Sequence, residues 1–203
     1  MKKAAFVVLS LVSLLAVYSL FFSPREIRNA TPSGENIICF GDSLTYGTGA
    51  REEMDYPAQL SRLIDQPVIN AGKPGDTTAT ALSRLEEDVL SQSPRIVLIT
   101  LGGNDLKNGI SKDKAFLNLR RIVEAIQAEG ALVVIGGVDF PFRGRGFGDA
   151  YKELSRSTRS LLVPNVLKGL MGKGELMSDP IHPNDKGYAI MAKKFHEVIK
   201  PYL

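Results

Sequence analysis

Cysteine is almost absent from this sequence, and that scarcity excludes two kinds of structure. Cys39 is the only cysteine among 203 residues, so the chain can form neither an intramolecular disulfide nor a thiolate metal cluster. Cys39 lies inside a short apolar run, where a thiol usually packs as a small hydrophobic side chain. We therefore expect Cys39 to belong to the core.

A strong excess of charge is absent as well. The chain has 25 Lys and Arg, or 23 without Lys2 and Lys3 at the N-terminus, against 22 Asp and Glu. A protein that neutralises phosphates along a nucleic acid normally carries a marked basic excess. The balance of charge therefore argues against a dedicated nucleic-acid binder.

One long apolar run is present at the N-terminus. Lys2 and Lys3 precede an uncharged run from Ala4 to Phe22, roughly 19 residues, which is close to the ~20 that cross a bilayer. No A-x-A-like cleavage site follows and Pro24 comes soon after, so we expect an uncleaved signal anchor, with a cleaved signal peptide as the open alternative. The basic flank predicts that the rest of the chain is exported to the periplasm or another extracytoplasmic space.

These features divide the chain into three parts. Residues 1–23 form the signal anchor or signal peptide, and residues 24–35 read as a polar linker that contains two prolines. Residues 36–203 have the length of one domain with a sizeable core. We expect a monomer that is tethered to the membrane by residues 4–22.

Within residues 36–203, short apolar runs alternate with segments of helical periodicity. This alternation predicts an α/β fold, a parallel sheet of about five strands with helices on both faces. A glycine-rich loop, Pro141–Gly148, interrupts the pattern. The expected strands are Asn36–Phe40, Pro67–Asn70, Arg95–Leu101, Ala131–Ile135 and Leu161–Leu167, and the expected helices are Tyr56–Ile64, Thr77–Leu90, Lys114–Glu129, Tyr151–Ser160 and Asp185–Tyr202.

Residues suited to acyl transfer follow the expected strands or precede the last helix. Ser43 comes directly after the first strand, at the edge where open α/β sheets bind ligands. A serine hydroxyl needs a neighbouring base, which His182 can supply, and Asp179 can orient the imidazole and stabilise its charged form. The Asn104 amide and the N–H groups of Gly72 and Ser43 can donate to a developing oxyanion.

Each of these residues also has an ordinary structural interpretation. A Gly-Asp-Ser sequence alone is common in turns and helix caps, and Asp179 with His182 could be a capped loop turn. The second histidine, His196, stands in the middle of the last helix and reads as a surface residue. The Gly-x-Ser-x-Gly elbow of the α/β-hydrolases is absent, which argues against that fold.

Four short blocks, taken together, carry a family resemblance. They are Gly41-Asp42-Ser43-Leu44, Asn70-Ala71-Gly72, Gly102-Gly103-Asn104-Asp105 and Asp179-Pro180-Ile181-His182-Pro183. In order and spacing they resemble the SGNH (GDSL-type) hydrolases, most closely the bacterial branch of arylesterases, acyl thioesterases and lysophospholipases. The membrane-length leader departs from that branch.

The resemblance implies a flavodoxin-like three-layer α/β/α sandwich and a hydrolase that needs no metal or cofactor. It implies Ser43 as nucleophile, His182 as base and Asp179 as the residue that orients it. Ser43, Gly72 and Asn104 would form the oxyanion hole.

The expected activity is cleavage of acyl esters or thioesters, such as lysophospholipids, through an acyl-serine intermediate. Two alternatives stay open, a carbohydrate O-acetyl esterase and a catalytically silent, membrane-tethered binding module. We expect Asp42 and Asp105 to hold loops rather than to react, and the loop Pro141–Gly148 to border the acyl pocket. Four arginines, which could meet anionic lipid, are expected to form a solvated face; they are Arg143, Arg145, Arg156 and Arg159.

Overall fold

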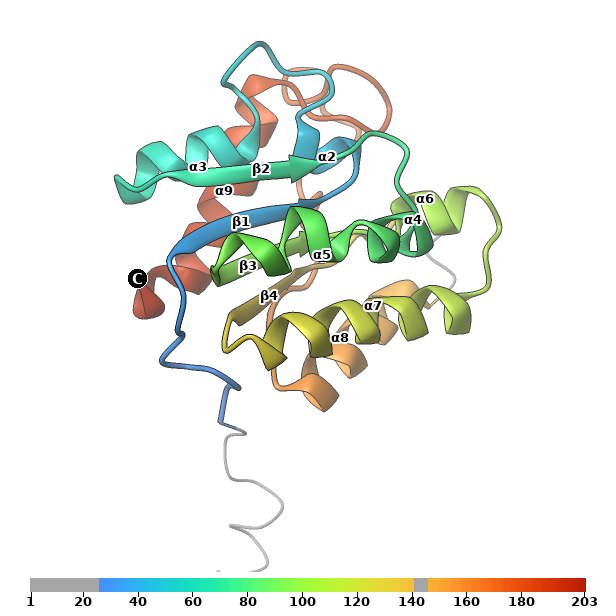
Figure 1. The fold of residues 1–203 in the computed structure, drawn as a ribbon. Helices are drawn as coiled ribbons and strands as arrows, with labels where there is room; N and C mark the ends of the chain where they lie inside the picture. Colours follow the sequence, from blue (N-terminus) through green and yellow to red (C-terminus); the bar gives the residue numbers. More distant parts are fainter. Residues whose placement is uncertain (1–25, 141–145) are drawn as a thin grey trace, which may run out of the picture.

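A parallel sheet of five strands forms the middle layer of the domain (Figure 1). The computed structural model describes residues 26–140 and 146–203. The strands lie in the order β2-β1-β3-β4-β5, and every neighbouring pair is parallel. The expected α/β fold is thereby confirmed. The strands are β1 (Asn36–Gly41), β2 (Val68–Gly72), β3 (Pro94–Thr100), β4 (Leu132–Gly136) and β5 (Leu161–Val163).

The central strand β3 is covered on both faces, which explains its continuous apolar sequence. Ile96 and Leu98 join the buried cluster on one face of the sheet, whereas Val97 and Ile99 join the cluster on the other. Alternate residues of a strand point to opposite faces, and burying each such side chain contributes about 1.5 to 3 kcal/mol. In the neighbouring strand Cys39 is fully buried, as expected.

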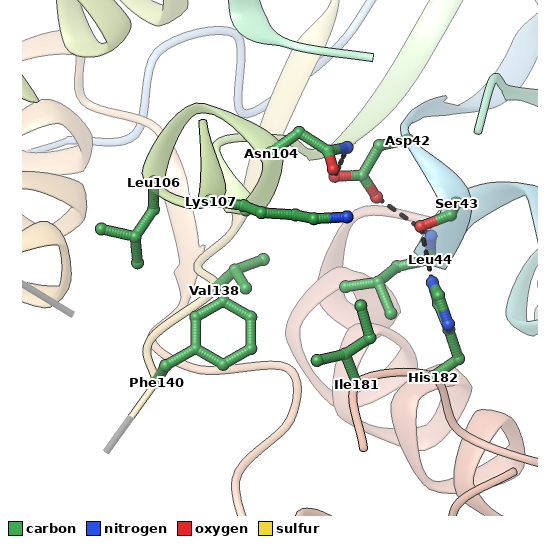
Figure 2. A pocket seen from close by; sticks show the side chains of 11 residues that line it. Asp42, Ser43, Leu44, Asn104, Leu106, Lys107, Val138, Phe140, Ile181 and His182 are labelled. Atoms are coloured by element: carbon green, nitrogen blue, oxygen red, sulfur yellow. Dashed lines mark hydrogen bonds between the residues drawn. The ribbon is translucent and has the colours of Figure 1, made fainter. Parts of the chain in front are cut away.

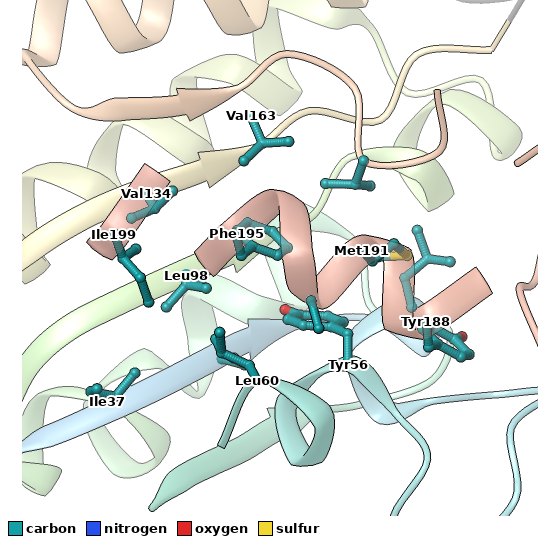
Figure 3. Close-up of a cluster of buried hydrophobic side chains, with 14 of the residues drawn as sticks. Ile37, Tyr56, Leu60, Leu98, Val134, Val163, Tyr188, Met191, Phe195 and Ile199 are labelled. Atoms are coloured by element: carbon teal, nitrogen blue, oxygen red, sulfur yellow. The ribbon is translucent and has the colours of Figure 1, made fainter. Parts of the chain in front are cut away.

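Helices pack against both faces of the sheet (Figure 1). One face is covered by α3 (Tyr56–Ile64) and α9 (Asp185–Ile199), and the other by α4 (Thr78–Ser83), α7 (Lys112–Ala128) and α8 (Phe147–Thr158). On the first face the rings of Tyr56 and Phe195 stack with their centroids 5.1 Å apart (Figure 3). The remaining helical segments are α2 (Ser43–Tyr46), α5 (Leu85–Asp88), η1 (Leu90–Gln92), α6 (Gly103–Lys107) and η2 (Lys200–Tyr202).

The expectation of one helix from Thr77 to Leu90 is wrong. The segment forms α4, α5 and η1, and Arg84 between the first two has a non-helical ψ of 6°. The Arg84 guanidinium donates to the carbonyl oxygens of Gly41 and Ala71 at the ends of β1 and β2, and it pairs with Asp76 at 2.6 Å. We attribute the break to these contacts, which draw the arginine towards the sheet.

Two further elements differ from their expected bounds by four residues at one end, whereas the others differ by three residues or fewer. Helix α8 begins at Phe147 rather than Tyr151, because Phe147 is buried and its ring packs edge-on against Phe116. Strand β5 ends at Val163 rather than Leu167, since Pro164 has no N–H to continue the ladder. Of the loop expected before α8, residues 141–145 lie outside the described residues.

The expected N-terminal anchor lies outside the described residues, which begin at residue 26. Among the residues that are described, no helix is both long enough and apolar enough to cross a bilayer. The described part of the expected linker contacts the domain, since Asn29 Nδ2 donates to the carbonyl oxygens of Gln127 and Ala131 at 2.9 and 2.8 Å. The division into anchor, linker and domain stays a prediction.

Candidate active site

Ser43 lies at the carboxyl edge of the sheet, where β1 passes into α2. Asp42 caps this short helix, because its Oδ1 accepts the N–H of Leu44 at 3.0 Å. The cap fixes the turn that follows Gly41 and presents Ser43 to a cavity. The serine therefore stands where the sequence predicts it.

A histidine from the loop before α9 meets this serine (Figure 2), and a carboxylate of the same loop bonds to the histidine. Ser43 Oγ lies 2.9 Å from His182 Nε2, and His182 Nδ1 lies 2.6 Å from Asp179 Oδ2. The second oxygen, Asp179 Oδ1, accepts the N–H groups of Ile181 and His182, each at 2.8 Å. These two bonds close the loop on itself and hold the carboxylate beside the imidazole.

The order of these atoms suits proton transfer from the hydroxyl to the ring. A carboxylate at Nδ1 selects the tautomer whose Nδ1 carries the proton, and this leaves Nε2 as an acceptor for Ser43. Desolvation opposes the charge on Asp179, but the hydrogen bonds from the His182 ring and from two backbone N–H groups outweigh it and hold the pKa of this carboxyl below its ordinary value. Asp179 therefore stays ionised at neutral pH.

A cavity of about 520 Å³ opens beside Ser43 and His182. Its walls are largely apolar, and Figure 2 shows Val138 and Phe140 on the side opposite the serine and histidine. Phe140 immediately precedes the glycine-rich segment that the sequence places near a pocket. The described lining consists of Asp42, Ser43, Leu44, Gly103, Asn104, Leu106, Lys107, Val138, Phe140, Ile181 and His182.

Asn104 brings an amide to the same cavity. Gly102 precedes α6 with a φ of 112°, a conformation that glycine adopts at little cost, and the turn delivers Asn104 beside Asp42. Asn104 Nδ2 donates to the Asp76 carbonyl oxygen at 2.9 Å and approaches Asp42 Oδ2 at 3.4 Å. One of its two N–H groups is thus firmly held, and the other makes only a long contact.

Gly72 is placed differently from the other expected oxyanion donors. It is not among the described residues that line the cavity, and its N–H donates to Asn70 Oδ1 at 3.0 Å. A Cβ at this position would overlap the backbone of Thr45 and Tyr46, so the glycine permits β2 to lie against α2. That Gly72 donates to an oxyanion stays a prediction.

Asp42 and Asp105, which stand next to Ser43 and Asn104 in the sequence, are buried and hydrogen-bonded. Asp105 accepts the N–H and the hydroxyl of Thr78 at 2.9 and 2.7 Å, which ties α6 to the start of α4. Asp42 is desolvated, and this burial, with further repulsion from Asp76 and Asp105, raises its pKa from 3.8 to about 7 despite the bond from Leu44. Both carboxyls therefore hold loops together, and the burial of Asp42 disfavours its ionised form.

The raised pKa of Asp42 gives a prediction for stability. The folded chain binds the proton of the Asp42 carboxyl more tightly than the unfolded chain does. The stability that this proton contributes is fully present below pH 3.8 and is lost as the pH rises towards 7. Between pH 4 and pH 8 the free energy of unfolding of the wild type should fall relative to Asp42→Asn by roughly 4 kcal/mol. Urea denaturation at both pH values measures this difference, with the exposed Asp65→Asn as the matched control. Parallel pH curves for wild type and Asp42→Asn would contradict the assignment.

The remaining candidates from the sequence are His196 and four arginines. His196 is partly buried on α9 and is not among the described residues of the cavity lining. Arg156 and Arg159 are exposed on or after α8, while Arg143 and Arg145 lie outside the described residues.

Sequence reasoning missed Lys107, which lines the cavity. Its spacing could have revealed it, because Lys107 follows Asn104 by three residues and so shares its face of a helix.

Comparison with known proteins agrees with this geometry. Residues 39–190 match the model of the GDSL-like Lipase/Acylhydrolase family. The chain is 29% identical over 182 residues to Esterase TesA of Pseudomonas aeruginosa, covering 84% of this chain and 90% of that protein. It is 28% identical to Thioesterase 1/protease 1/lysophospholipase L1 of Escherichia coli strain K12, covering 83% and 85%. A crystal structure of TesA superposes with a TM-score of 0.77 at 29% identity, covering 83% of this chain and all of that one.

Proposed function

The chain belongs to the GDSL-like lipase/acylhydrolase family, and from this premise we propose that it is a serine hydrolase of acyl esters and thioesters. The observation that carries the proposal is the continuous line of hydrogen bonds from Ser43 through His182 to Asp179, with 2.9 and 2.6 Å between the joined atoms. A hydroxyl, an imidazole and a carboxylate in this order form the unit that makes serine nucleophilic. We therefore propose Ser43 as the nucleophile, His182 as the base and Asp179 as the residue that orients the base.

In the first half-reaction Ser43 Oγ attacks the ester carbonyl carbon while His182 Nε2 takes the hydroxyl proton. The carbonyl oxygen becomes an oxyanion, for which we propose the Asn104 amide and the N–H groups of Ser43 and Gly72 as donors. When the tetrahedral intermediate collapses, the carbon–oxygen or carbon–sulfur bond to the leaving group breaks and His182 returns the proton to that group. The product is an acyl ester of Ser43 and a free alcohol or thiol.

In the second half-reaction water takes the place of the alcohol. His182 removes a proton from the water, whose oxygen attacks the acyl carbon, and the same donors face the second oxyanion. Collapse releases the carboxylic acid and restores the Ser43 hydroxyl. Asp179 holds the ring in one tautomer throughout and stabilises its charged form. The proposal assigns no metal or cofactor to any step.

The cavity suggests the class of acyl group. Apolar side chains make up about half of its described lining, namely Leu44, Leu106, Val138, Phe140 and Ile181. A site of this kind gains affinity from burial of apolar surface, about 0.8 kcal/mol for each methylene. We therefore propose single-chain acyl esters, including lysophospholipids, as substrates.

The N-terminal segment suggests where the enzyme acts. The basic residues and the apolar run from Ala4 to Phe22 support export with a retained anchor. We propose an extracytoplasmic, membrane-tethered monomer. Carbonate extraction of membranes from expressing cells tests the tether, because release of full-length chain into the wash would contradict it.

Turnover of p-nitrophenyl esters from acetate to palmitate by the full chain in detergent tests the activity. If the apolar walls bind the acyl chain, kcat/KM should rise with chain length and reach its maximum at medium or long chains. Activity confined to acetate would instead favour a carbohydrate O-acetyl esterase. Absence of both turnover and labelling by a fluorophosphonate probe would leave a binding module.

A further inference from the structure

Lys107 brings a positive charge into a cavity that is otherwise mostly apolar. Among the described residues of the lining it is the only lysine or arginine. It occupies the last position of α6, one turn after Asn104. Figure 2 shows its side chain extended along the cavity, with the nitrogen directed towards the side that holds Ser43 and Asp42.

This ammonium has no protein partner within residues 26–140 and 146–203. None of the hydrogen bonds or ion pairs found there involves Lys107 Nζ. Lys194, by contrast, donates to the carbonyl oxygens of Val166 and Lys168, each at 2.7 Å. The three donors of Lys107 are therefore free for a group that enters the cavity.

Asp42, the one acidic side chain among the described residues of the lining, is already hydrogen-bonded. Asp42 Oδ1 accepts the N–H of Leu44, and Asp42 Oδ2 faces the Asn104 amide. The other buried carboxyls of this region, Asp76 and Asp105, are bonded to Arg84 and Thr78 and are not among the described residues of the cavity lining. Lys107 itself is exposed and lines the cavity, so its ammonium is open both to solvent and to an anion that enters the cavity, where opposite charges attract each other at short range.

We propose that Lys107 selects esters that carry an anionic group, a carboxylate or a phosphate, within a few atoms of the scissile bond. The inference rests on the proposed function, because it concerns the substrate of the same site. The anion can belong to the acyl chain or to the alcohol that leaves. Lys107 acts on specificity through binding, and Ser43 and His182 carry the chemistry for charged and neutral esters alike.

Two pairs of esters matched in chain length separate these sources. Methyl pentanoate and monomethyl glutarate differ by a carboxylate on the acyl side, whereas butanoylglycerol and its 3-phosphate differ by a phosphate on the alcohol side. Acid release in a pH-stat gives kcat and KM for each. For each pair we define the preference as kcat/KM of the anionic ester divided by kcat/KM of the neutral ester. For at least one pair this preference should be about tenfold higher in the wild type than in Lys107→Met.

The difference should lie in KM, and Lys107→Arg should restore most of it because the charge is kept. Raising the salt from 0.05 to 0.5 M should reduce the preference of the wild type, since ions screen exposed charges. Lys114→Met removes an exposed charge of α7 that does not line the cavity and should change neither ratio. Ratios that are the same in wild type and Lys107→Met for both pairs would overturn the proposal.

A binding measurement separates failure of this inference from failure of the proposed function. In the Ser43→Ala background, calorimetry of monomethyl glutarate and of butanoylglycerol 3-phosphate should show a Kd about tenfold higher when Lys107 is also replaced by methionine. This readout needs no turnover. If each anionic ester binds with the same Kd with and without the Lys107 replacement, the role of Lys107 is refuted, whatever the activity. If the Kd values differ but the wild type is inactive, only the proposed hydrolysis is refuted.

Discussion

Replacing Ser43 with alanine is expected to lower kcat for p-nitrophenyl esters by about 10⁴-fold or more, because the variant has no nucleophile to form the acyl-enzyme. The side chain donates to no group other than His182 among the described hydrogen bonds, through the 2.9 Å contact with Nε2. Its removal should therefore leave the fold intact. Initial rates with the best ester of the series measure the loss, and a fluorophosphonate probe should label the wild type alone.

His182→Ala should cause a loss of similar size, since the hydroxyl then lacks a base. The double variant should be no slower than either single one, because the two residues act as a unit. Ser83→Ala provides the matched control: Ser83 Oγ donates to the Thr80 carbonyl oxygen on α4, away from the cavity. Activity in Ser43→Ala above a hundredth of the wild-type value, or additive losses in the double variant, would disprove the assignment.

The sequence predicts most of the fold and of the site because the relevant signals are local. Apolar runs of strand length identify the strands, and parallel strands bring their carboxyl ends to one edge. Ser43 and Asn104 follow β1 and β3, so their shared location needs no knowledge of side-chain packing. The Asp-Pro-Ile-His spacing likewise encodes a local turn, in which the N–H groups of Ile181 and His182 bond to Asp179.

What the sequence does not predict depends on contacts between distant segments. Arg84 breaks a helix whose periodicity is otherwise regular, because its partners lie at the ends of β1 and β2. The pKa of Asp42 rises through desolvation and through two carboxyls, Asp76 and Asp105, that approach from other segments of the chain. The cavity walls come from α2, α6, the segment after β4 and the loop before α9. These groups come together only in the folded chain, so the periodicity of the sequence does not reveal their contacts.

The Asn104 amide offers the second large effect. Asn104→Ala should lower kcat by about 10² to 10³ and change KM much less, the range seen when one oxyanion donor is removed. One N–H of the amide is held by the Asp76 carbonyl oxygen at 2.9 Å, so the group is oriented before substrate arrives. The other makes only a 3.4 Å contact with Asp42 Oδ2, so little is lost when it donates to an oxyanion instead. Steady-state kinetics with the best p-nitrophenyl ester measure both constants.

Asn104 also links α6 to the loop before α4, so a loss of activity could arise from a loosened structure. Two variants separate the causes. Asn104→Asp keeps the size of the side chain but removes its N–H donors, so kcat should fall as far as in Asn104→Ala. Asn118→Ala removes a buried amide that donates to Thr78 Oγ1 at 3.2 Å and is not among the described residues of the cavity lining. This variant should lower the free energy of unfolding by about 1 to 3 kcal/mol and leave kcat near the wild-type value. If Asn104→Ala lost stability as Asn118→Ala does but kept its full kcat, Asn104 would be a loop support and the oxyanion would depend on backbone donors alone.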